Sequence, residues 1–418
     1  MFVIFILSLP LLVLSIAQIG GKDILISYAT TSLLILYFFL RKKNAKIYFP
    51  VQAVFFLVFF VYLLMTVGYF SFSGMINEKH ISQLATYTIY FFFYVLLVNV
   101  FVLQSKKQLI RYVNLFILIC VVFSLYSVLQ AFLPTGSIVF KLFRNANSSF
   151  ALWDPTNEGH RVGWFGLYRV TGLAAEPSMW AGFLAVPLCL LLPRLYYKFE
   201  RRDFYCFFGI LLGFLFTFGR TGFYSVFLAA ISFPCFILKG NKRRWYVLFV
   251  VFVISSSIFY GLFADILLLG GRDWSRIERA TGMIIASRMF VSNPLFGVGI
   301  GGYRNRSMEY GFEGMRLEGG GAGYPYNFYL GLAAETGIIG LALWLFFLKS
   351  FWNKLSYQIS CFKENTEERI LYLGLGLAFL SIVFSWINVG GINSVYIFFI
   401  FALISAMSKS VDRVPIMR

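Results

Sequence analysis

The sequence predicts an all-α, polytopic integral membrane protein, and three observations lead to this class. Of its 418 residues, 59% are hydrophobic and only 13% are charged, whereas a soluble domain carries about 25% charged residues. The mean hydropathy is +0.78. Apolar runs of about 18 residues or more, each long enough to cross a bilayer as a helix, recur from one end to the other. We therefore expect a single transmembrane domain over residues 1–418.

About twelve membrane-spanning helices are expected along the chain. The first, over 2–19, lacks a basic segment before it and a small-residue cleavage site after it, so we expect a retained helix rather than a removed signal peptide. The spans that follow are 24–40, 48–70, 83–103, 112–133, 177–193, 204–218, 221–238, 245–262, 326–348, 370–387 and 391–408. These spans hold few polar residues, among them Gln130 and Glu335. A transporter would normally line a path at the bilayer midplane with such residues.

The basic residues predict the orientation. The chain has 36 Lys and Arg against 18 Asp and Glu, a balance that would also suit nucleic acid, but 22 of the 36 fall in six short segments between alternate spans. These segments are 41–46, 106–111, 194–202, 239–244, 349–369 and 409–418. By the positive-inside rule they are cytoplasmic, so both termini lie inside. This distribution indicates a lipid bilayer and excludes nucleic acid as the partner.

Arginine predominates on the opposite, external face. Outside the six basic segments the chain has 11 Arg and 3 Lys. Arginine presents a rigid fork of donors that matches phosphate and carboxylate, which lysine does not. We therefore expect an anion-binding face there. The alternative is that these arginines form salt bridges with acidic residues of the same loops.

Two external segments are long, about 134–176 and 263–325. Connections longer than about 15 residues are uncommon unless they are functional or disordered, so we expect both to border one reaction chamber. Within the second, Gly297–Gly302 matches G-x-G-x-x-G, but no strand–helix unit surrounds it. A turn whose glycines let the backbone approach a ligand or the membrane explains it better. Cysteine and histidine show no ligand spacing, so we expect no metal and no cofactor.

Four residues on the external side are candidate catalytic groups: Arg220, Arg288, Glu176 and Tyr326. Arg220 lies in a tight turn, where it either binds a ligand or extends to the interface. Glu176 precedes Pro177 at a helix start, so it is either a helix cap or a general base. Tyr326 and Asn327 begin a span, where a tyrosine and an N-cap are ordinary structural residues.

The stretch 276–290 shows partial helical periodicity. Ile277, Ala280, Met283 and Ile284 would form one apolar face, as in an amphipathic helix on the outer surface. Its arginines either reach over the chamber or lie on the solvated face. The arginines expected to bind substrate are Arg169, Arg276, Arg279 and Arg304.

Several motifs resemble the bacterial O-antigen polymerase and O-antigen ligase superfamily of membrane glycosyltransferases. The family's His-Asn, nine residues and Gly-x-x-Gly is matched by Tyr326-Asn327, residues 328–336 and Gly337-Ile-Ile-Gly340. The layout of spans and external loops is also similar. Further matches are NPLFGVGIGGY at 293–303, the Arg-x10-Gly pattern from Arg288 to Gly299, and GRTG at 219–222.

This resemblance implies a GT-C-like enzyme of the bacterial cytoplasmic membrane, active on its periplasmic or extracellular face. The implied donor is a glycan on undecaprenyl diphosphate, the reaction is metal-independent and inverting, and Arg220 and Arg288 would bind the diphosphate. Asn327 would help to bind substrate. A flippase and a chain-length regulator are implied as candidate partners. Ligases carry histidine where this chain has Tyr326, and tyrosine, with a pKa near 10, is a poor base. The exchange favours a polymerase of O-antigen, capsule or exopolysaccharide, with a ligase or a flippase as alternatives.

Overall fold

The computed structural model describes residues 1–12, 15–19, 22–41, 47–72, 76–132, 161–162, 167–174, 176–238, 274–311, 324–388 and 394–407. Among these residues, six helices are long and apolar enough to cross a membrane. They are α3 (Val51–Phe72), α4 (Glu78–Val102), α5 (Lys106–Phe132), α7 (Pro177–Tyr197), α14 (Phe328–Cys361) and α15 (Glu367–Ser385). Shorter helices accompany them: α2 (Ile26–Arg41), α8 (Arg201–Phe216), α9 (Arg220–Ser232), α10 (Pro234–Ile237) and α16 (Val395–Met407). The chain is therefore a predominantly helical, multi-pass membrane protein, as predicted.

The bundle packs around an aromatic core. All residues of α16 are buried, as expected for a helix that is apolar on every side. Phe56 of α3 packs against Phe347 of α14, with ring centroids 5.0 Å apart. Trp344 lies on the same cluster, 5.1 Å from Phe347. Such aromatic pairs add about 0.5–1.5 kcal/mol each beyond the area they bury, so they help to fix how α3 packs against α14.

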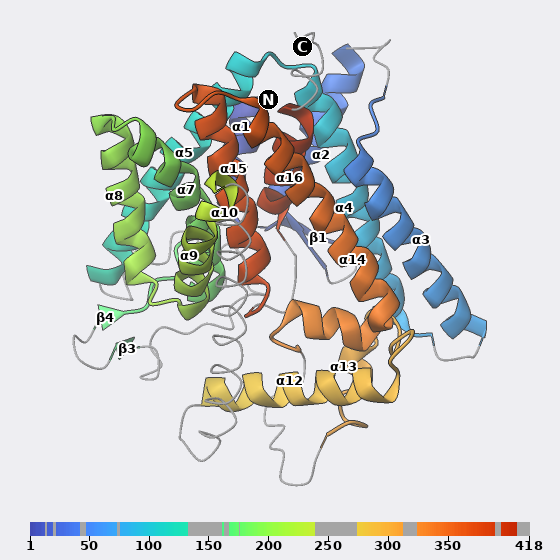
Figure 1. The fold of residues 1–418 in the computed structure, drawn as a ribbon. Helices are drawn as coiled ribbons and strands as arrows, with labels where there is room; N and C mark the ends of the chain where they lie inside the picture. The colour runs from blue at the N-terminus through green and yellow to red at the C-terminus, as the bar shows by residue number, and fades with distance from the viewer. Residues whose placement is uncertain are drawn as a thin grey trace.

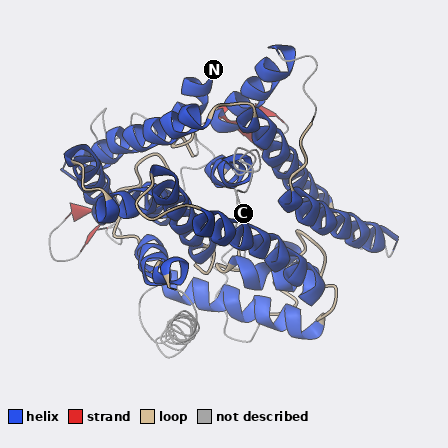
Figure 2. Cartoon of the chain, turned by 45° about the horizontal axis from the view of Figure 1, so that its top comes forward, coloured by secondary structure: helices blue, strands red, loops and turns tan. Residues whose placement is uncertain are grey.

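Helices that are distant in sequence lie side by side in the bundle. Helix α15 packs against α7 and α9, α16 against α4, α14 against α3, and α5 against α8. Figure 1 shows that the segments joining α4 to α5, α7 to α8 and α14 to α15 lie at one end, which we call the basic end. The starts of α7, α9 and α14 lie at the other end, which we call the α12 end after helix α12 (Trp274–Ser292). Figure 2 shows the bundle tilted forward, with helices making up most of the described chain.

The prediction of one helix over 2–19 is wrong. Helix α1 covers only Phe2–Ser8, and strand β1 (Ser15–Ile19) pairs with β2 (Lys22–Leu25) in an antiparallel hairpin. Pro10 explains the early helix end, because proline has no N–H to donate and its ring clashes with the preceding turn. A second small hairpin joins β3 (Arg161–Val162) to β4 (Leu167–Tyr168), so the all-α class holds apart from these strands.

The expected span 245–262 lies outside the described residues, as do large parts of the external segments 134–176 and 263–325. The described part of the second segment contains α12 and the short helix α13 (Tyr303–Arg306). The predicted amphipathic helix over 276–290 is thus confirmed as a helix. It lies across one end of the bundle, next to the start of α14 (Figure 1).

Candidate active site

Arg169 is held against the turn that carries Arg220. Its Nε donates to the carbonyl oxygen of Thr217 at 3.3 Å and its Nη2 to that of Phe218 at 3.2 Å. The main chain next to Arg169 contacts the same segment, because the Val170 N–H donates to the Phe216 carbonyl at 3.2 Å. Two predicted arginines from separate segments, Arg169 and Arg220, are thereby brought to one place.

Gln130 anchors the segment that carries Arg169. The Gly172 N–H donates to Gln130 Oε1 at 2.9 Å, and Gln130 Nε2 donates back to the Gly172 carbonyl at 3.3 Å. A side-chain amide that pairs with both polar groups of one peptide fixes that peptide's position. Gln130, one of the few polar residues in the expected spans, therefore has a positioning role at the α12 end.

The first turns of α7 and α9 are in direct contact. A Cβ on Gly219 would lie 2.6 Å from Ala181 Cβ, closer than folded proteins tolerate, and 3.2 Å from the Pro177 carbonyl oxygen. Glycine at this position therefore lets α9 start against α7. Glu176 is the N-cap residue of α7 and Arg220 the first residue of α9. The carboxylate and the guanidinium thus start from adjacent helix ends, and both residues are exposed.

Glu176 does not use its carboxylate as a helix cap. No side-chain capping bond is formed, and Oε2 instead accepts the Ser178 hydroxyl at 2.9 Å. The capping explanation for this residue is therefore not supported by its contacts. A carboxylate that accepts one hydroxyl keeps further lone pairs for a ligand. Ser178 was not among the sequence-predicted residues, and only its i+2 spacing from Glu176 could have indicated it.

Two non-glycine residues beside the predicted site adopt left-handed backbone conformations. Phe218, two residues before Arg220, has φ +45°, and Tyr326, just before Asn327, has φ +51°. Such conformations cost on the order of 1–3 kcal/mol each and concentrate at functional sites. Each lies at the α12 end, two residues before a helix begins: Phe218 before α9 and Tyr326 before α14.

Arg288 lies on the exposed side of α12. Its Nη1 donates to the carbonyl oxygens of Gly311 at 2.9 Å and Tyr310 at 3.3 Å, so the guanidinium organises the chain that follows α13. The buried face of α12 differs from the predicted one. It contains Ala280 and Ile285, whereas the predicted Met283 and Ile284 are only half-buried. The buried face therefore continues further along the helix than the apolar pattern indicated.

The other arginines of this region have separate positions. Arg279 is half-buried on α12 with its Nε enclosed and, among the described residues, without a hydrogen-bond acceptor. Arg276 lies in the first turn of α12, and its side chain is outside the described part of the structure. Arg304 is exposed on α13. These arginines lie on α12 and α13, whereas Arg220 begins α9 and Arg169 is bound to the turn before it. The described residues thus place two groups of arginines at one end of the bundle.

The glycine-rich stretch 293–303 is clamped onto α14. The N–H groups of Val298 and Gly299 donate to the carbonyls of Ala334 and Glu335, both at 2.9 Å, and the Ile338 N–H donates to the Pro294 carbonyl at 2.8 Å. Gly297 has φ +69°, and a Cβ there would lie 2.6 Å from the Ala334 carbonyl oxygen. The glycines therefore allow backbone to approach backbone, and the expectation that they face a ligand or the membrane is wrong.

This clamp coincides with a break in α14. Gly337 has φ +65° and ψ −170°, so the helix interrupts its regular geometry there, with Leu295 in contact. Glu335, just before the break, accepts the Tyr303 N–H at 3.2 Å. Tyr303 in turn donates its hydroxyl to the Gly282 carbonyl of α12 at 3.0 Å. Burial raises the pKa of this phenol, so the hydroxyl keeps its proton.

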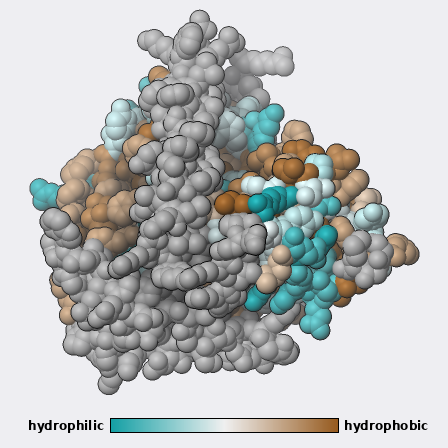
Figure 3. Space-filling view, turned by 90° about the horizontal axis from the view of Figure 1, so that it is seen from below, coloured by the Kyte–Doolittle hydropathy of each residue, from teal (hydrophilic) through white to brown (hydrophobic). Residues whose placement is uncertain are grey.

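Tyr326 and Asn327 lie where α12 meets α14. Gly282 of α12 leaves room for the Tyr326 ring, since a Cβ there would lie 3.2 Å from Tyr326 Cδ2. The Asn327 side chain accepts the Leu330 N–H at 3.0 Å, so Asn327 is an N-cap and the structural interpretation of this residue is confirmed. The Phe328 N–H donates to the Trp386 carbonyl at 2.9 Å, which ties the motif to the end of α15. Figure 3 shows this end of the molecule, with hydrophilic residues beside hydrophobic ones.

The fold and this site define a multi-pass membrane protein with arginines and a carboxylate gathered at one end. A family model described as O-antigen ligase matches residues 205–345. The match confirms the resemblance to the O-antigen polymerase and ligase superfamily. It includes Arg220, α12, the glycine-rich clamp and Tyr326-Asn327, and it leaves Arg169 and Glu176 outside. No curated protein gave a significant match to the chain.

Proposed function

We propose that this protein polymerises glycan repeat units carried on undecaprenyl diphosphate, at the external face of the bacterial cytoplasmic membrane. The observation that carries this proposal is the joining of Arg169 to the Arg220 turn, next to the Glu176 helix end. An arginine and a carboxylate that start from adjacent helix ends, Arg220 and Glu176, suit a reaction in which a diphosphate leaves and a hydroxyl attacks. The superfamily match supports the same reaction class.

In this mechanism the acceptor hydroxyl oxygen attacks the anomeric carbon of the donor glycan, and the bond from that carbon to the diphosphate breaks. Arg220 and Arg288 bind the diphosphate and stabilise the charge that develops on it as it leaves. Glu176 takes the hydroxyl proton. A single displacement of this kind inverts the anomeric centre. Arg169 holds the Arg220 turn in place, and Gln130 holds Arg169.

A ligase is the second candidate, because the matching family model is described as an O-antigen ligase. A ligase would use the same donor and the same arginines but transfer finished glycan to a different acceptor. The residue at 326 argues against it, since tyrosine is a weaker base at neutral pH than the histidine expected there. We therefore prefer the polymerase over the ligase as the function of this site.

Deleting the gene and separating the surface polysaccharide on a gel tests the proposal. A polymerase is indicated if the ladder disappears and a single repeat unit remains. Polymer that accumulates on undecaprenyl diphosphate would indicate the ligase instead. Lipid-linked units retained in the cytoplasm would contradict both and indicate a flippase. Complementation with the intact gene must restore the ladder, which controls for effects on neighbouring genes.

A further inference from the structure

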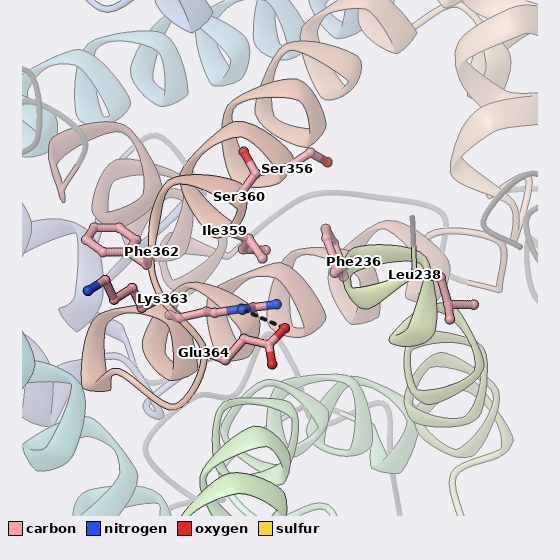
Figure 4. Close-up of a pocket in the computed structure, with 9 residues that line it drawn as sticks. Phe236, Leu238, Ser356, Ile359, Ser360, Phe362, Lys363 and Glu364 are labelled. Atoms are coloured by element: carbon pink, nitrogen blue, oxygen red, sulfur yellow. Dashed lines mark ion pairs between the residues drawn. The ribbon is translucent and has the colours of Figure 1, made fainter. Parts of the chain in front are cut away.

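A pocket opens at the basic end of the bundle, far from the site described above. It lies where α14 ends and α15 begins, beside the short helix α10 (Figure 4). Its volume is about 250 Å³. The lining residues are Phe236, Leu238, Ser356, Ile359, Ser360, Phe362, Lys363, Glu364 and Arg369. None of them takes part in the reaction proposed above.

Arg369 gives the pocket a buried positive charge. The residue is only 7% exposed, and its Nη1 lies 3.4 Å from Glu364 Oε1, the ion pair drawn in Figure 4. Its Nε is fully enclosed and, among the described residues, meets no acceptor. A buried charged donor without an acceptor is costly. An acceptor supplied from outside the chain would remove that cost.

Two further groups favour an anion in the same place. The Ser356 hydroxyl is enclosed and has no partner among the described residues, so it offers a second donor to a bound oxygen. Lys363 contributes another positive charge to the lining. Glu364 opposes an anion, but its side chain is 75% exposed, and an exposed carboxylate turns toward solvent at little cost. A guanidinium fork beside a hydroxyl matches the oxygens of a phosphate group.

The remaining walls are apolar. Phe236 and Leu238 of the α10 region stand on one side, with Ile359 and Phe362 from the end of α14 and its following turn on the other. A free phosphate ion would form no apolar contacts with these walls, whereas a phospholipid carries acyl chains that could pack against them. Basic pockets between helix ends are typical headgroup sites. We propose that this pocket binds the phosphate of an anionic phospholipid, with Arg369 Nε and the Ser356 hydroxyl as donors and the acyl chains along the apolar walls.

The test measures the thermal unfolding of the full-length protein in detergent micelles with three additives. Phosphatidylglycerol supplies phosphate and chains, diacylglycerol supplies chains alone, and inorganic phosphate supplies the anion alone. Of the three additives, we expect only phosphatidylglycerol to raise Tm, by about 3 °C or more at saturation. An equal rise with inorganic phosphate would overturn the lipid assignment. An equal rise with diacylglycerol would overturn the role of the phosphate.

Variants locate the effect in this pocket. Arg369→Met and Ser356→Val should each reduce the rise in Tm caused by phosphatidylglycerol, Arg369→Met to near zero. Ser360→Trp, at an exposed position of the rim, should block entry without removing a buried group, which keeps the test valid if Arg369→Met misfolds. Arg201→Met is the matched control, because Arg201 is an exposed arginine at the same end. A rise retained in all three pocket variants, or lost equally in Arg201→Met, would refute the site.

Discussion

The carboxylate of Glu335 accepts the main-chain N–H of Tyr303 at 3.2 Å, and this bond joins the broken helix α14 to the glycine-rich stretch. Tyr303 also donates its hydroxyl to α12. One acidic residue inside an apolar helix therefore links the three pieces of chain that place Arg288 and Tyr326. We infer that Glu335 is a positioning residue rather than part of a transport path.

Glu335→Ala should lower the free energy of unfolding by about 1–3 kcal/mol, because it leaves a buried N–H without its acceptor. Glu335→Gln keeps an acceptor oxygen and should cost less. Thermal unfolding in detergent measures both. Glu309→Ala is the control, since Glu309 forms an exposed ion pair with Arg306 at 2.9 Å, and such pairs contribute little. Equal stability of Glu335→Ala and the intact protein would contradict the clamp.

Gly337→Ala should abolish polysaccharide synthesis and destabilise the protein. The residue has φ +65°, and a Cβ there would collide with the Leu295 carbonyl, so alanine meets both backbone strain and a backbone clash. Gly68→Ala is the control, because a Cβ on Gly68 of α3 meets nothing within 4 Å. That change should be neutral or slightly stabilising. Normal glycan ladders from Gly337→Ala cells would show that the break in α14 is dispensable.

The sequence predicted the helical membrane class and the α12 helix better than it predicted the contacts between the segments at the α12 end. Charge placement and apolar runs can be read from the sequence without knowing which distant segments touch. The helical bundle and the α12 helix were therefore predictable. The hairpin at 15–25 was not, because its strands lie within an apolar run that reads equally well as a helix. The run over 2–19 is long enough for a membrane-spanning helix, and Pro10 within it is the residue that marks the break.

The roles of Gln130, Glu335 and the glycines could not be predicted because each acts across a contact between distant segments. Gln130 pairs with Gly172, 42 residues away. Gly297 faces main chain of α14 and Gly301 faces main chain of α4, with a Cβ on Gly301 lying 2.5 Å from the Lys79 carbonyl oxygen. A motif shows that glycine is present, but only the packing shows what approaches it. The superfamily motif at 293–303 is thus explained by helix packing.

Arg169→Lys should reduce activity nearly as much as Arg220→Lys, since Arg169 holds the turn that carries Arg220. Lysine keeps the charge but cannot donate to both the Thr217 and Phe218 carbonyls in the same fork geometry. We expect a loss of roughly tenfold or more in each single variant, and a double variant that loses much less than the product. An in vitro polymerisation assay measures this, with Arg201→Lys at the basic end as control. If the losses of the two single variants multiply in the double variant, the two arginines act independently, and Arg169 does not act through the turn that carries Arg220.

Tyr326→Phe should retain most of the activity, because a phenol is a poor base at neutral pH and its ring packs over Gly282. Tyr326→Ala removes the ring and should lower both stability and activity. Tyr326→His tests whether the histidine expected in ligases makes the enzyme transfer glycan to a different acceptor. The products are compared on gels after complementation of the deletion strain. A loss of about a hundredfold in Tyr326→Phe, with unchanged Tm, would assign the hydroxyl to the chemistry instead.

Glu176→Gln should abolish turnover while leaving the fold intact. The amide has nearly the shape of the carboxylate but cannot take a proton, and removing a general base costs about 10²–10⁴-fold in rate. Stability should be unchanged, because the Glu176 side chain forms no helix-capping bond and is exposed. Ser178→Ala is the matched control, since it removes the partner hydroxyl at 2.9 Å but keeps the carboxylate, and it should retain activity within a few-fold. The decisive readout is the rate of glycan transfer at saturating donor, set beside Tm for each variant. A Glu176→Gln enzyme that transfers glycan at the normal rate would remove Glu176 as the base, and the acceptor hydroxyl would then have to be deprotonated by another group at the α12 end.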